Sequence, residues 1–200
     1  MIVGRFGSRV KQSIICALAL ANLWPSHLLT AQDHSAHAAQ PAALTTAATA
    51  LIQTVREATA GFQNSADAVK AGYHLQFGCV SGPDSGAMGL HFVNGDLVQS
   101  GIIDPRRPQI VIYEPAADGT LKLIGADYLV LAEQWDSDPN HHGPPEMMGQ
   151  LFHYFEAPNR FGLPAFYTLH VWAWKDNPNG AFVNWHPNVN CSQFNSPTTR

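Results

Sequence analysis

The spacing of hydrophobic and polar positions divides the chain beyond residue 44 into a helical part and a longer part with strand patterns. Apolar residues recur at helical spacing between positions 45 and 60, so one face of a helix is apolar; they are Ala47, Leu51, Val55 and Ala58. A second helical segment is predicted from Ser65 to Ala71, because Gly72 follows it and glycine is typical just beyond a helix C-terminus.

From Tyr73 onwards, short apolar runs alternate with turn residues, a pattern typical of strands. Strands are predicted at 74–80, 109–114, 122–131, 166–174 and 181–185, with a short strand or loop at 89–94 and one helical turn near 97–101. Residues 134–164 form the longest segment without a clear period, which is typical of a binding loop or lid. Helices followed by a run of strands predict an α+β fold, with an N-terminal helical region packed on a mostly antiparallel sheet or partial barrel.

The N-terminus has the pattern of a secretory signal peptide over residues 1–31. Three basic residues, Arg5, Arg9 and Lys11, precede an apolar run that ends at Pro25. That run is too short for a membrane span, which needs about 20 residues. We therefore predict a secreted or periplasmic protein without a stable membrane anchor, with a flexible leader at 32–43 and a single α+β domain at 44–200.

Composition narrows the function classes. The 200 residues are 46% hydrophobic and 13% charged, which suits a single packed domain. The net charge is −4, and the three bases of residues 1–31 leave 8 basic and 15 acidic residues in the rest, which argues against nucleic acid as a partner. Standard motifs for serine hydrolases, nucleotide binding, zinc proteases and dithiol oxidoreductases are absent from the sequence.

Two cysteines, Cys79 and Cys191, remain beyond the signal peptide. In an oxidising compartment, two cysteines allow one intramolecular disulfide, which is the pairing we predict. The alternatives are two free thiols or a thiolate metal ligand.

Histidines supply the candidate chemistry, since nine of the ten lie beyond residue 31. His91 follows two glycines, His170 lies among aromatic residues on one face of a predicted strand, and Glu114 ends an apolar strand face. Together these three residues predict a site for one transition metal (zinc, copper or iron), with Glu114 as a ligand or general base. The alternative is that the histidines form hydrogen bonds within the sheet and Glu114 pairs with a nearby basic residue.

Aromatic residues near these histidines predict an apolar pocket for a small-molecule ligand. Strand alternation places Trp172 and Trp174 on the face of His170. The full set of predicted ligand-binding residues is Tyr113, Trp172, Trp174, Trp185 and His186. Two other functions stay open: a metal-free module that binds a small molecule, and a cell-envelope interaction protein without a pocket.

Several motifs resemble a group of uncharacterised secreted bacterial proteins. They are Gly-Ala-Met-Gly-Leu-His-Phe-Val-Asn at 86–94, Tyr-Glu-Pro at 113–115, Leu-His-Val-Trp-Ala-Trp at 169–174, Asn-Pro-Asn-Gly at 177–180, and the terminal Cys191. The resemblance covers roughly residues 50–191. It implies a secreted single-domain protein and lends no activity.

Overall fold

The computed structural model describes residues 44–194, so the predicted signal peptide at 1–31 and the leader at 32–43 lie outside the described residues. The helices are α1 (Thr46–Thr59), the 3-10 helix η1 (Ala60–Phe62), α2 (Ser65–Lys70), α3 (Gly95–Ser100) and α4 (Ala132–Asp136). The strands are β1 (His74–Gly82), β2 (Gly86–Val93), β3 (Ile110–Pro115), β4 (Leu121–Leu131), β5 (Glu146–Met147), β6 (Gln150–Leu151), β7 (His153–Phe155) and β8 (Phe166–Val171).

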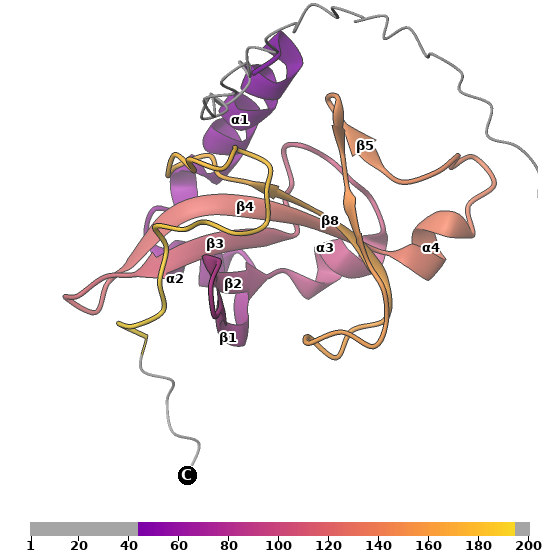
Figure 1. Ribbon diagram of the computed structural model, residues 1–200. Helices are drawn as coiled ribbons and strands as arrows, with labels where there is room; N and C mark the ends of the chain where they lie inside the picture. Colours follow the sequence, from indigo (N-terminus) through magenta and orange to yellow (C-terminus); the bar gives the residue numbers. More distant parts are fainter. Residues whose placement is uncertain (1–43, 195–200) are drawn as a thin grey trace, which may run out of the picture. The chain divides into compact units, whose positions relative to one another are not determined.

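Six of these strands form one antiparallel sheet in the order β1-β2-β3-β4-β8-β7, and β5 and β6 form a separate small hairpin. The sheet curls into a half-barrel, with β3 and β4 as its central strands and β4 as its longest (Figure 1). The predicted α+β class, with a helical region beside an antiparallel sheet or partial barrel, is confirmed.

Helix α1 covers one face of the sheet. Its buried residues Leu51 and Val55 pack against strands β4 and β8 through a core cluster that includes Tyr128 and Leu169. Thr45 caps the helix, because its side-chain oxygen accepts a hydrogen bond from the backbone N–H of Ala48. Of the four residues whose spacing predicted this helix, Leu51 and Val55 are buried, Ala58 is half-buried and Ala47 is exposed.

The opposite face of the sheet has its own core. Apolar residues of β3, β4 and β8 pack there with residues from the C-terminal segment: Ile110, Ile112, Leu129, Phe166, Trp172 and Val189. The predicted disulfide between Cys79 and Cys191 is present and joins β1 to that segment. Both faces of the sheet are therefore covered by packed side chains.

Three segments differ from the sequence predictions. The last long strand ends at Val171 rather than 174, and residues 181–185 form turns and irregular structure instead of a strand. The segment 134–164 contains the end of α4 and three short strands. Among residues 44–194, no helix combines the length and the apolar character that crossing a bilayer requires.

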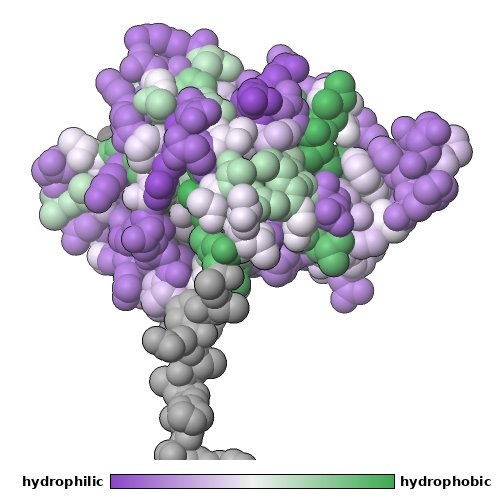
Figure 2. Space-filling model, turned by 90° about the horizontal axis from the view of Figure 1, so that it is seen from above, coloured by the Kyte–Doolittle hydropathy of each residue, from purple (hydrophilic) through white to green (hydrophobic). Residues whose placement is uncertain are grey.

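Hydrophobic side chains on the face seen in Figure 2 form small patches separated by hydrophilic residues. Exposed large hydrophobic residues among those described include Phe77 on β1, Ile102 after α3, and Tyr154 on β7. Of these three, Phe77 also lines an internal cavity, so its ring lies between solvent and the interior.

Candidate metal centre

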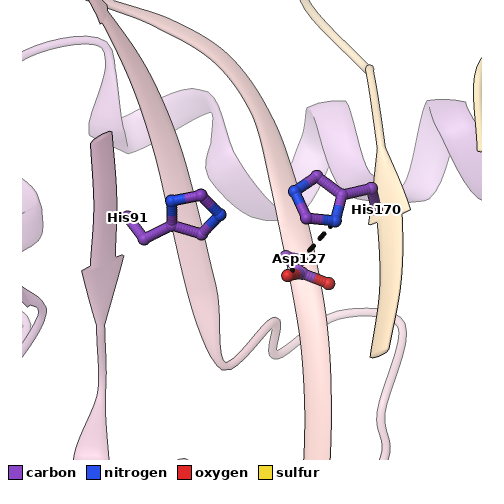
Figure 3. A group of neighbouring side chains, drawn as sticks. All are labelled: His91, Asp127 and His170. Atoms are coloured by element: carbon purple, nitrogen blue, oxygen red, sulfur yellow. Dashed lines mark ion pairs between the residues drawn. The ribbon is translucent and has the colours of Figure 1, made fainter. Parts of the chain in front are cut away.

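Three potential metal ligands meet inside the half-barrel: His91, Asp127 and His170. Each offers a ligand atom such that the three atoms lie within 4.8 Å of one another. All three are buried, with exposed fractions of 5%, 3% and 2%. The two imidazole rings lie edge to face with their centres 5.5 Å apart, and the carboxylate lies beside His170 (Figure 3).

Strand register explains why residues so distant in sequence converge. His91 on β2 pairs with Ile112 on β3, and Asp127 on β4 pairs directly with His170 on β8. Paired residues on neighbouring strands project to the same face of a sheet. One face therefore collects a carboxylate and an imidazole side by side, with the second imidazole two strands away across the inner curve.

Two glycines, each two residues before a member of the centre, let the strands approach closely. A Cβ atom on Gly89 would lie 2.6 Å from the carbonyl oxygen of Tyr113, and Gly89 has a φ of +96°. A Cβ on Gly125 would lie 2.5 Å from the carbonyl oxygen of Val171. These glycines share strand parity with His91 and Asp127, so they also leave room on the face where the centre lies.

Hydrogen bonds engage only part of the polar capacity of the centre. Thr168 donates its hydroxyl hydrogen to Oδ1 of Asp127 at 2.5 Å, and Nδ1 of His91 lies 3.3 Å from the carbonyl oxygen of Gly89. Nδ1 of His170 is 3.3 Å from Oδ2 of Asp127 but lacks hydrogen-bond geometry, so both buried His170 nitrogens have no hydrogen-bond partner. Unpaired buried polar atoms are costly, and a bound cation is one way to satisfy them.

Burial sets the protonation of the three groups. Desolvation lowers the pKa of His91 to about 4, with His170 adding to the effect, and lowers that of His170 to about 3, with His153 adding. Desolvation raises the pKa of Asp127 to about 6, against the hydrogen bond from Thr168 and the charge of His91. At neutral pH the centre therefore holds two neutral imidazoles and one carboxylate, the states that coordinate metals.

A small apolar cavity adjoins the centre. Its volume is about 30 Å³, and His91, Asp127, Thr168 and His170 are its polar lining. The remaining lining is hydrophobic: Phe77, Met88, Ile110, Leu129, Phe155, Phe161, Leu163 and Phe166. A volume of this size holds one or two small molecules such as water. The centre therefore faces a small, mostly apolar space.

Comparisons with known proteins identify no relative. No protein-family model, curated protein or solved structure matches the chain. The resemblance to secreted bacterial proteins thus stays a prediction, and the function is inferred from the geometry of this chain alone.

Glu114, predicted as the carboxylate ligand, is not part of the group that the structure brings together. It lies near the end of β3 and forms an ion pair with Lys175 at 2.6 Å. His91 pairs with Ile112 and Asp127 with Ile110, so Glu114 lies two to four residues farther along β3 than the centre. The structure places Asp127 beside His91 and His170 instead.

None of the five predicted pocket residues lines the cavity beside the centre. Trp172 packs beside a member of the centre without lining the cavity, since its ring centre is 5.8 Å from that of His170. The other four contact different parts of the molecule. Tyr113 donates its hydroxyl hydrogen to the carbonyl of Phe62, and the indole N–H of Trp174 donates to the hydroxyl of Thr59. Trp185 lies near Arg160, and the ring nitrogens of His186 contact the carbonyl of Asp176 and the N–H of Asn188. The aromatic wall comes from phenylalanines on β1, β7, β8 and the loop before β8.

The pKa shifts predict how acid changes the stability of the metal-free protein. Below pH 6.5 the unfolded chain protonates His91 and His170 while the folded protein does not. The free energy of unfolding therefore decreases as the pH is lowered. Asp127 acts in the opposite direction, because from about pH 6 to 4 its carboxylate is protonated first in the folded state. Asp127→Asn removes this offset, so its stability should fall more steeply than that of wild type, by about 1 kcal/mol per pH unit.

Urea unfolding at several pH values between 6 and 4, in the presence of a chelator, measures this difference. Glu114→Gln leaves the three groups in place and is the control for the loss of a carboxylate outside the centre. Equal slopes for wild type and Asp127→Asn would contradict the protonation states described above.

Proposed function

We propose that this protein binds one divalent transition metal ion through His91, Asp127 and His170 and uses it to act on a small molecule. The observation that carries the proposal is the convergence of three buried ligands, one of which has no hydrogen-bond partner at either ring nitrogen. Two imidazoles and a carboxylate are a ligand set of zinc, copper and non-haem iron.

Three protein ligands favour a reactive centre over a structural one. Structural zinc sites in proteins usually have four protein ligands, whereas catalytic sites keep a position for water or substrate. The apolar cavity beside the centre supplies the space for such a molecule. In this low-dielectric space the ion would polarise a bound water or substrate oxygen strongly. Metal-assisted activation of a small molecule is therefore the function supported best.

The same proposal includes export from the reducing cytoplasm. The Cys79–Cys191 disulfide is typical of oxidising compartments, and the signal-peptide pattern at residues 1–31 agrees with it. A secreted or periplasmic location is therefore part of the proposal.

The test is the metal content of the protein, purified without an affinity tag and dialysed against zinc, cobalt or iron(II). About one ion per chain is expected for wild type. Asp127→Ala should lose the ion, and Glu114→Gln should keep it, because the two carboxylates differ in whether they lie beside the histidines. No bound ion in wild type, or equal loss in both variants, would overturn the proposal and favour a metal-free binding module.

Thr168 is expected to act as a positioning residue for Asp127. Its hydroxyl holds Oδ1 of the carboxylate, and a partner of this kind typically contributes 10–100-fold to metal affinity. Thr168→Val should therefore weaken cobalt binding by about tenfold or more, as measured by competition with a chromophoric chelator. Thr168→Ser should restore most of the affinity, which a purely steric role of the side chain would not predict.

A further inference from the structure

We propose that the cavity beside the candidate metal centre binds an uncharged, apolar molecule about the size of one aromatic ring, and that Phe77 is the side chain that moves to admit it. This inference names the class of ligand that the proposed metal site would take. The role of this ligand rests on the proposed function, but the cavity and its cover are defined without the metal.

The chemistry of the wall selects the ligand. Eight hydrophobic side chains line the cavity, and no lysine or arginine is among the lining residues in the described part of the chain. The carboxylate of Asp127 is already buried there, so a second anion would meet no compensating side chain. The body of the ligand must therefore be apolar and uncharged, and any polar group it carries must lie at the floor, beside His91 and His170.

The volume of the cavity requires a side chain of its wall to move when the ligand binds. A volume of about 30 Å³ is too small for an organic molecule. Most of the lining is buried, and the phenylalanines Phe155, Phe161 and Phe166 contact one another with ring centres 5.0–6.4 Å apart. These rings support each other, so they are the fixed part of the wall.

Phe77 differs from the rest of the lining. It is 46% exposed and contacts the aromatic wall through Phe161, with ring centres 5.5 Å apart. Turning its ring outward exposes only the half of its surface that is still buried, less than for any ring deeper in the wall, and vacates the space of one phenyl group. The space gained sets the size of the ligand.

The backbone at Phe77 is built to hold this side chain out of the strand alternation. Phe77 has a φ of +64° and Gly78 a φ of +65°, within an irregularity of β1 between Gln76 and Cys79. A left-handed phenylalanine is uncommon and unfavourable, and bulges near functional sites often redirect a side chain. The disulfide at Cys79 fixes the chain directly after this irregularity.

The cover also lies between the two outer strands of the half-barrel. Phe77 comes from β1 and Phe155 from β7, which are at opposite ends of the strand order. The guanidinium of Arg160, in the segment between β7 and β8, donates to the carbonyl of Ser81 on β1 at 3.0 Å. The two edges thus meet beside the cavity, and Phe77 is the exposed side chain at their junction.

The experiment measures binding of benzene, naphthalene and sodium benzoate to the purified protein by calorimetry and by NMR shifts, with and without zinc. Wild type should bind benzene but not benzoate in the metal-free state. Phe77→Ala should bind naphthalene at least about tenfold more tightly than wild type, a gain of about 1.4 kcal/mol. Tyr154→Ala is the matched control, since Tyr154 is also exposed and pairs with an aromatic ring, 5.3 Å away, but does not line the cavity.

Phe77→Gly is a second variant that removes the ring and suits the positive φ, so misfolding cannot hide the effect. Absence of benzene binding in all variants, tighter binding of benzoate than of benzene without metal, or equal naphthalene affinity in Phe77→Ala and Tyr154→Ala would overturn the inference. Benzene binding by a protein that takes up no metal would support the cavity and contradict the proposed function. Metal binding without benzene binding would support the proposed function and contradict the cavity ligand.

Discussion

His170→Leu is expected to stabilise the metal-free protein and to destabilise it relative to wild type when zinc is present. Without metal, leucine replaces two buried nitrogens that have no hydrogen-bond partner, and leaving such atoms unpaired costs about 1–3 kcal/mol. With zinc at a thousand times its Kd, wild type should gain about 4 kcal/mol. The variant should gain almost nothing. The measurement is urea unfolding with chelator and with zinc.

His186→Leu is the matched control for this reversal of sign. His186 is fully buried like His170, but its Nε2 lies 3.1 Å from the carbonyl oxygen of Asp176 and its Nδ1 accepts from the N–H of Asn188. Its replacement should destabilise the protein with and without zinc. If His170→Leu also destabilises the metal-free protein, the centre is a structural polar cluster and the proposed metal role fails.

Replacing both Cys79 and Cys191 by serine is expected to lower the free energy of unfolding by up to about 5 kcal/mol. The disulfide closes a loop with a sequence separation of 112 residues, and loops of this length restrict the unfolded chain strongly. Few small domains retain a folded majority after such a loss. Chemical denaturation of the double variant, compared with oxidised wild type that keeps the bridge, provides the measurement.

The reduced wild-type protein should match the double variant within about 1 kcal/mol, because both lack the same constraint. A loss much smaller than 1 kcal/mol in both would show that the unfolded chain is already restricted without the bridge.

The fold could be predicted from the sequence wherever the periodicity was uninterrupted. The apolar spacing through Leu51 and Val55 matches the buried face of α1, and the disulfide followed from the number of cysteines. The strand prediction failed beyond Val171, because the chain leaves β8 there and strand alternation no longer applies to Trp174. Trp174 lies instead beside α1, where its indole N–H donates to Thr59.

His91 and His170 could be predicted from the sequence, and the position of Asp127 in its strand also indicates a functional residue. Asp127 lies within the buried stretch of β4, where every other residue from Leu123 to Val130 is hydrophobic or glycine. A carboxylate at such a position needs a partner across the sheet, which distinguishes it from Glu114 near a strand end. Its partner could not be identified from sequence, because the pairing of Asp127 with His170 depends on the register between β4 and β8.

The depth at which His91, Asp127 and His170 are buried has a consequence for the kinetics of metal exchange. A chelator cannot reach a ligand sphere that is at most 5% exposed, so it cannot displace the ion by direct attack. Release must wait for an opening of the site, such as the outward turn of Phe77, and its rate is then set by that opening and not by the strength of the chelator. A centre of this kind should exchange its ion slowly, so the metal supply in the compartment where the chain folds would favour the ion that the mature protein carries first.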